Sequence, residues 1–192
     1  MTIAHTLWVF DAITGLRDLR NKSLPDVLNI LNFDFLPNCV GPVPGKTDTI
    51  SSAVATRATG TTIAPGRFDA VVFLVKDATQ SFGPKVGGTG PGGADVLGQT
   101  FLGAAGGDVA EVYWDRCFSS REMAASIFHE AAHLKSGLGQ SMHNQTVGAP
   151  HGGPGLRVLR ANGASFSSPS YDDLDFYAAA IARPILLRRT IP

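Results

Sequence analysis

Two histidines stand four residues apart, with a glutamate directly after the first, in the stretch FHEAAHLK at 128–135. On an α-helix, His129 and His133 would lie one above the other on the same face, so both imidazoles can bind one metal ion at about 2.0 to 2.1 Å. Glu130 would lie at the edge of that face, close enough to contact a water on the metal without being a ligand. The HExxH pattern therefore predicts a zinc centre with His129 and His133 as ligands and Glu130 as general base.

A catalytic zinc site needs a third protein ligand and an open position for water. The chain has only three glutamates and none follows the motif, which excludes sites that take a glutamate from a later helix. His143 is the favoured third ligand, because a short glycine-containing loop would let the chain turn back beneath the metal just after the helix ends. The alternatives that stay open are His151 and three aspartates near the start of the last predicted helix: Asp172, Asp173 and Asp175.

Length and composition indicate a single soluble domain spanning residues 1–192. Sixteen basic residues balance sixteen acidic ones, which argues against nucleic acid or an anionic membrane as partner. No apolar run approaches the roughly 20 residues that cross a bilayer, and residues 1–10 lack the basic start and apolar block of a secretory signal. Cys39 and Cys117 are expected to be buried and reduced, and they leave the compartment open.

The histidine pair is expected to lie on a helix over residues 121–135. Ser119 or Ser120 with Glu122 forms a helix-start pattern, because a serine hydroxyl can accept from the amide three residues on while the glutamate reaches back. Gly137 and Gly139 are suitable ends. Four apolar residues at helical spacing form the expected buried stripe: Met123, Ile127, Ala131 and Leu134.

The other predicted elements give strands first and helices last, which favours an α+β fold with a small mixed sheet packed on the active-site helix and a C-terminal helix. The glycine-rich stretch 82–107 shows no regular element, and 41–66 is either loop or a weakly marked edge strand. Predicted strands cover 6–12, 68–78 as a buried central strand, 109–115 as a half-buried strand, and 155–161. Predicted helices cover 25–33, begun by Ser23 and ended by Pro37, and 168–182, begun by Ser168 or Ser170 and ended near Pro184.

The sequence HEAAH inside a predicted helix, preceded by the strand VAEVYWD, resembles the zincin superfamily of zinc-dependent peptidases. Ser136 and Gly139 stand where the metzincin motif HExxHxxGxxH has its glycine and third histidine, so the chain is not a regular metzincin. The segment DDLDFYAAAI at 172–181 is similar to the last helix of the aspzincins, the deuterolysin-like and lysine-specific endopeptidases.

The aspzincin resemblance covers about residues 108–185, and it departs from the family at one important place. GQSMHNQTVG at 139–148 replaces the family's Gly-Thr-x-x-Asp stretch. The resemblance therefore implies a zincin-like α+β fold, a bound Zn²⁺, peptide-bond hydrolysis, and His143 in place of the family's aspartate ligand.

The chemistry expected of this site is metal-assisted amide hydrolysis by a zinc metalloendopeptidase acting on a peptide or protein substrate. Zinc lowers the pKa of a bound water towards about 7, and Glu130 would accept the water's proton and pass it to the leaving nitrogen. Strand 109–115 would align an extended peptide if it is an exposed edge, as in other zincins, but not if it is an interior strand. An oxyanion donor is also expected, with three candidates: Tyr171, Tyr177 and Arg157.

Two other functions compete with the peptidase. One is a non-catalytic metal-binding or structural protein on a zincin scaffold. The other is a zinc hydrolase that acts on a small amide.

Overall fold

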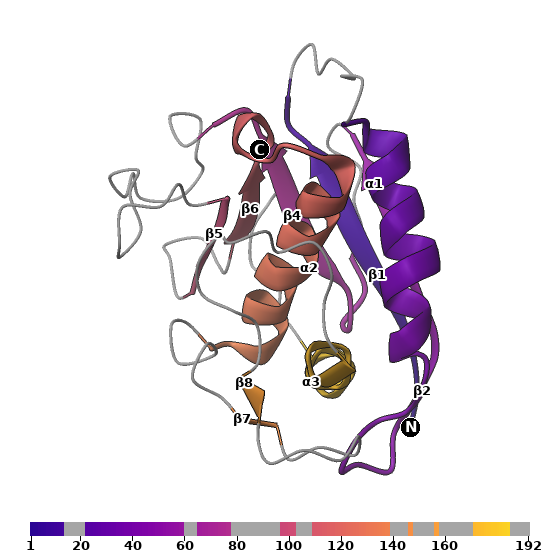
Figure 1. Ribbon diagram of the computed structural model, residues 1–192. Coiled ribbons are helices and arrows are strands. Elements are labelled where there is room, and N and C mark those ends of the chain that lie inside the picture. Colours follow the sequence, from indigo (N-terminus) through magenta and orange to yellow (C-terminus); the bar gives the residue numbers. More distant parts are fainter. Residues whose placement is uncertain are drawn as a thin grey trace.

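The computed structural model describes residues 1–13, 22–59, 65–77, 97–102, 109–138, 146–147, 156–157 and 171–184. In this part of the chain, a six-stranded mixed sheet and three α-helices form a mixed α+β fold, and two further short strands form a small second sheet. The three helices α1, α2 and α3 lie in front of the large sheet in Figure 1, with α3 seen end-on. Of the helices described, none has the length and apolar character needed to span a bilayer.

The large sheet has the strand order β2-β3-β1-β4-β6-β5. Its strands are β1 (Thr2–Asp11), β2 (Gly41–Pro42), β3 (Thr49–Ala58), β4 (Ala70–Val75), β5 (Gly98–Phe101) and β6 (Val109–Tyr113). The four inner strands β3, β1, β4 and β6 run parallel, whereas β2 and β5 are antiparallel strands at the two ends of the sheet. Every residue of β4 is buried, so the predicted central strand within 68–78 is confirmed.

The strand β6 differs from the prediction for residues 109–115. Of the two alternatives left open for its position, the interior strand is correct, because β6 lies between β4 and β5. It is, however, not half-buried: Ala110 and Val112 face the helices, while Glu111 and Tyr113 are buried on the opposite face. The Tyr113 hydroxyl donates a hydrogen bond of 3.0 Å to the Glu111 carboxylate there, which allows a polar side chain in a fully buried strand.

The end strands were the elements least visible in the sequence. Strand β5 lies within the glycine-rich stretch 82–107, where no regular element was expected. Of the two alternatives for 41–66, a strand is correct: this stretch contains the edge strand β2 and also the ten-residue β3, which lies next to it in the sheet and was not expected as an inner strand.

The outer side of β3 is partly closed by a side chain. The Asn32 amide donates to the Ala55 carbonyl at 2.9 Å, and its oxygen accepts from the Ala55 amide at 2.7 Å. Asn32 therefore occupies both main-chain groups of one residue on a sheet edge, which hinders pairing with another strand there.

The first helix, α1 (Leu24–Ile30), begins as predicted after Ser23, whose hydroxyl accepts from the Asp26 amide at 3.2 Å. It does not end at Pro37. The chain continues through a π-helical turn (Leu31–Phe35) into a 3-10 turn (Leu36–Cys39), and Pro37 lies in the first turn of the latter, where its missing N–H costs nothing.

The C-terminal helix α3 (Tyr171–Ile181) falls within the predicted 168–182. Strands β7 (Thr146–Val147) and β8 (Leu156–Arg157) pair with each other, and β8 is the described part of the strand predicted at 155–161.

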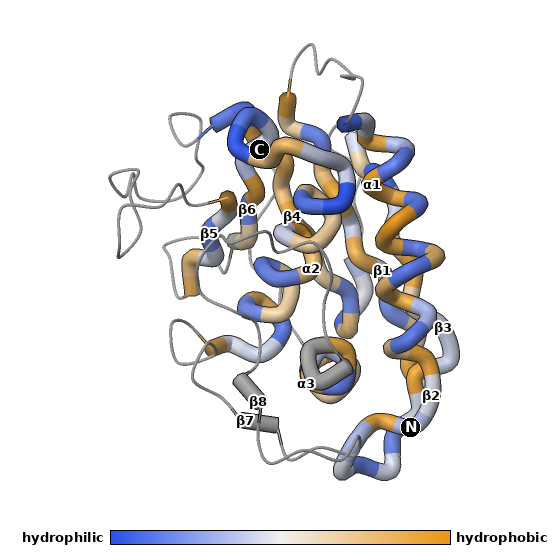
Figure 2. Tube along the Cα trace, viewed as in Figure 1, coloured by the Kyte–Doolittle hydropathy of each residue, from blue (hydrophilic) through white to orange (hydrophobic). Residues whose placement is uncertain are grey.

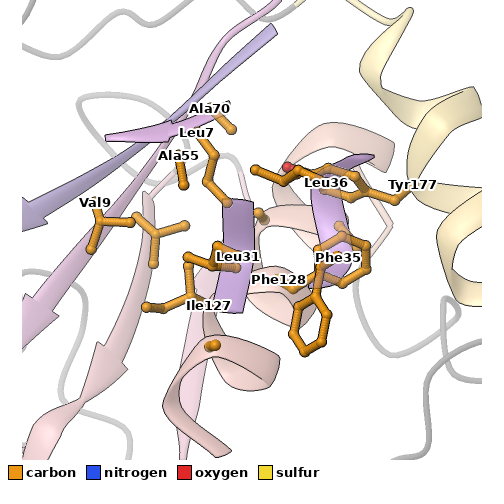
Figure 3. Close-up of a cluster of buried hydrophobic side chains, with 14 of the residues drawn as sticks. Leu7, Val9, Leu31, Phe35, Leu36, Ala55, Ala70, Ile127, Phe128 and Tyr177 are labelled. Atoms are coloured by element: carbon orange, nitrogen blue, oxygen red, sulfur yellow. The ribbon is translucent and has the colours of Figure 1, made fainter. Parts of the chain in front are cut away.

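The main hydrophobic core lies between the sheet and the helices. Figure 3 shows side chains of the sheet, such as Leu7 and Ala70, meeting Phe35, Phe128 and Tyr177 from the helical layer. Along α1 and α2, hydrophilic and hydrophobic residues alternate in Figure 2, as expected for helices with one buried face. Both cysteines are buried with free thiols, as predicted.

Candidate metal centre

The helix that carries the HExxH motif is α2 (Ser120–Ser136), and its ends follow the predicted pattern. The Ser119 hydroxyl accepts from the Glu122 amide at 3.1 Å, and the Glu122 carboxylate reaches back to accept from the Phe118 amide at 2.6 Å. Gly137 ends the helix in the left-handed conformation, with φ of 68°, and its amide donates to the His133 carbonyl. Such an end favours glycine because a Cβ atom would be strained there.

The burial of α2 holds the motif in one orientation. The four residues of the predicted apolar stripe are all buried, and the helix packs against β4, β5 and β6 on one side and against α1 and α3 on others. A helix fixed on several sides cannot rotate about its axis, so the direction in which each side chain points is set by the core.

The two histidines of the motif face each other. Their Nε2 atoms are 3.1 Å apart, and their ring centroids are 4.7 Å apart with the planes at 77°. His133 is buried, and its Nδ1 donates to the Leu138 carbonyl at 2.7 Å, so its Nε2 accepts a hydrogen bond from Nε2 of His129 at 3.1 Å.

This geometry fits a shared metal ion. Two imidazole nitrogens bound to one tetrahedral zinc at about 2.05 Å would be about 3.3 Å apart, close to the observed Nε2–Nε2 distance of 3.1 Å. The hydrogen bond from Nδ1 of His133 to a main-chain carbonyl is the usual arrangement behind a metal-binding histidine. His129 and His133 could therefore hold zinc with little movement of either ring.

Glu130, between the two histidines, points towards strand β5. Its Oε2 accepts a hydrogen bond of 2.7 Å from the Thr100 hydroxyl, which also lies 3.0 Å from the Glu130 main-chain oxygen. Burial raises the pKa of Glu130 to about 8, the Thr100 hydrogen bond opposes this rise, and the nearby Glu111 carboxylate adds to it. A carboxyl group with this pKa is protonated at neutral pH, so a positive charge nearby would be needed to lower the pKa and give the carboxylate that accepts a proton.

Gly98 lets β5 come this close to the helix. A Cβ atom at Gly98 would lie 2.9 Å from Cγ of Glu130 and 2.7 Å from the main-chain oxygen of Glu111, closer than real Cβ contacts. Any side chain at this position would push β5 away from α2. The site therefore depends on two β5 residues, Gly98 and Thr100, that the sequence analysis did not identify.

The favoured third ligand, His143, lies outside the described residues, as does His151. Helix α3 includes Asp172 and Asp173, but their side chains are also outside the description; that of Asp175 is described and is partly buried. Among the side chains that are described, no three of the His, Cys, Asp and Glu types gather as a metal-binding group. The structure thus brings His129 and His133 together, whereas the Glu130 carboxyl group contacts Thr100 of β5, and the third ligand stays a prediction.

Of the three candidates for the oxyanion donor, only Tyr177 has a described side chain. It is fully buried in the core, where its hydroxyl contacts Nε2 of His5 at 3.1 Å and its ring packs on Phe128. Because this hydroxyl is engaged inside the core, Tyr177 is not placed to contact a substrate. Tyr171 and Arg157 lie in described elements, but their side chains fall outside the description.

Comparison of the chain with protein-family models, with curated proteins and with solved structures gave no match. The HExxH motif and the geometry around it are therefore the features that bear on function.

Proposed function

We propose that this protein is a zinc-dependent peptidase of the zincin type, with His129 and His133 as metal ligands, His143 as the third ligand and Glu130 as the general base. The observation that carries this proposal is the pair of imidazole Nε2 atoms, 3.1 Å apart on one face of α2. A buried carboxyl group with a raised pKa directly follows the first of these histidines. That combination is what metal-assisted hydrolysis requires.

The arrangement of elements around α2 supports a zincin-like reading of the fold. The motif helix packs against a mixed sheet, and the sheet's outer strand next to that helix is antiparallel to its neighbour. Helix α3 packs against α2 from another side. The mixed sheet packed on the motif helix and the C-terminal helix beside it are features expected from the resemblance of residues 108–185 to the superfamily, whereas the antiparallel strand β5 was not expected.

The roles of the side chains follow from their chemistry. Zinc, when bound, would act as a Lewis acid that makes a water more acidic and polarises the scissile carbonyl. Glu130 accepts the proton of the attacking water and delivers it to the leaving nitrogen. The Leu138 carbonyl holds the His133 ring in the tautomer whose Nε2 can bind metal.

Strand β5 takes the peptide-aligning role that the sequence analysis gave to residues 109–115. The Tyr113 amide donates to the Leu97 carbonyl, so the main-chain groups of Leu97 point inward to β6. In an antiparallel pair, the main-chain groups of every second residue point to the partner strand. The main-chain groups of Gln99 therefore also point to β6, and those of Gly98 and Thr100 point outward. In the described part of the fold β5 pairs only with β6, so an extended peptide can add to its outer side.

The test is zinc content and cleavage of casein and of a mixed peptide library, measured for wild type and Glu130→Gln. We expect about one bound zinc in both proteins, and a loss of activity on the order of 10²- to 10⁴-fold in the variant. Glu122→Gln, the same change near the start of α2, is the matched control and should keep its activity.

Three outcomes would contradict the proposal. Equal, metal-independent behaviour of wild type and Glu130→Gln would exclude catalysis by this site. Stoichiometric zinc without cleavage of any substrate would indicate a non-catalytic metal-binding scaffold. Zinc-dependent hydrolysis of small amides but not of peptides would indicate the small-molecule enzyme.

A further inference from the structure

Thr100 connects the edge strand to the general base. Its hydroxyl donates to Oε2 of Glu130 at 2.7 Å. Among the described residues, Thr100 is the side-chain hydrogen-bond partner of the Glu130 carboxyl group. We propose that Thr100 is a positioning residue, which fixes the Glu130 carboxylate relative to a peptide bound along β5. This inference rests on the proposed peptidase function and adds a residue that the motif does not contain.

The Glu130 side chain needs a fixed hydrogen-bond partner, because a glutamate has three rotatable bonds and loses conformational freedom when it is ordered. Threonine is a suitable partner, since its branched Cβ restricts its own side-chain rotation. Thr100 is in turn held in the sheet through its neighbour Gln99, whose main-chain groups point to β6, while Thr100 itself lies opposite Ala110. The carboxylate is thereby fixed to the sheet as well as to its own helix.

The neighbouring residue on the same face of β5 is adapted to the same contact. Side chains two residues apart on a strand point to the same side, so Gly98 and Thr100 both face α2. Gly98 leaves room for the Glu130 side chain, whose Cγ would lie 2.9 Å from a Cβ atom at that position. One residue provides the space and the other provides the hydrogen bond.

Thr100 also has a second contact surface. Its side chain points to Glu130, while its main-chain groups point to the outer side of β5, where a peptide would add. A peptide paired with β5 would then be placed relative to the general base through a single residue. Misplacement of catalytic groups by about 1 Å can cost on the order of 100-fold in rate, so this link would matter for kcat.

The experiment compares zinc-loaded wild type with Thr100→Val and Thr100→Ser. Valine keeps the shape and removes the hydroxyl, whereas serine keeps the hydroxyl. We expect Thr100→Val to lower kcat by about 10- to 100-fold, with KM within about twofold and zinc content unchanged, and Thr100→Ser to recover most of the rate. A merely structural role would not give this split between kcat and KM or the recovery by serine.

A second measurement needs no activity. In the zinc-free protein, unfolding of wild type, Thr100→Val, Glu130→Met and the double variant forms a double-mutant cycle. A hydrogen bond between these side chains predicts a coupling of about tenfold in the unfolding equilibrium constant.

The outcomes separate this inference from the peptidase proposal. An active wild type together with a Thr100→Val variant of unchanged kcat would overturn the positioning role and leave the peptidase standing. The absence of coupling in the cycle would also overturn it. A zinc-loaded wild type without hydrolytic activity would reject the peptidase and the positioning role together.

Discussion

At the scale of single residues, the sequence was most informative where helical spacing alone decides the geometry. The four-residue separation of His129 and His133 predicted that the rings meet on one face of a helix, and they do. Thr100 could not be found in this way, because its contact with Glu130 spans 30 residues of sequence. Such contacts depend on how the strands are ordered, which local spacing does not encode.

The third ligand is the residue-scale prediction that most directly identifies the metal centre. If His143 binds the zinc, His143→Ala should lower zinc affinity by about 100-fold or more, whereas Asp172→Ala should leave it within a fewfold of wild type. Zinc competition with a chromophoric chelator measures both. The reverse order of the two variants would assign the third position to the aspartate cluster of α3.

At the scale of elements, helices and strands with strong local sequence patterns were predicted well, and those with weak patterns were not. The strand β4, rich in β-branched residues, and the capped helix α2 were both found where expected. Strand β5 was missed because its four residues, GQTF, are too short to show alternation and lie in a glycine-rich stretch. Strand β6 was placed correctly in sequence, but the choice between an edge and an interior strand stayed open, since only tertiary structure shows that β5 pairs with its outer side.

The start of α2 gives a prediction at this scale. Ser119→Ala removes the hydroxyl that accepts from the Glu122 amide, so it should lower the free energy of unfolding by about 1 kcal/mol. Ser119→Asp, which can accept the same hydrogen bond, is the control and should stay close to wild type. Urea denaturation at neutral pH measures both variants. An alanine variant as stable as wild type would mean that water replaces the cap without cost.

At the scale of the whole molecule, a buried polar contact joins segments that are far apart in the chain. His5 of β1 donates from Nδ1 to the Phe68 carbonyl at 2.8 Å and contacts the Tyr177 hydroxyl of α3 through Nε2 at 3.1 Å. The first strand, the segment before β4 and the last helix are thereby linked. Burial lowers the pKa of His5 to about 4 from 6.5, against the opposing hydrogen bond to Phe68.

This contact predicts how stability depends on pH. Between pH 4 and 6.5 the unfolded chain carries a proton on His5 that the folded protein does not, so the contribution of His5 to the free energy of unfolding should rise with pH across this window. This contribution is complete above pH 6.5 and lost below pH 4, and it amounts to about 3 kcal/mol. Glu130, whose pKa is raised, contributes the opposite slope above about pH 4.5, so the His5 contribution is read from the difference between wild type and His5→Gln in urea denaturation from pH 4 to 7. Parallel curves for the two proteins would contradict the prediction.

The contact of Asn32 with the outer side of β3 affects how copies of this protein can associate. Because the Asn32 amide occupies both main-chain groups of Ala55, it hinders growth of the sheet between two copies at this part of β3, and β5 is the strand at the opposite end of the sheet where another strand can add. Self-association and substrate would then compete for one strand. If β5 binds a peptide substrate as proposed, specific activity should fall as the protein becomes more concentrated, and dilution should restore it.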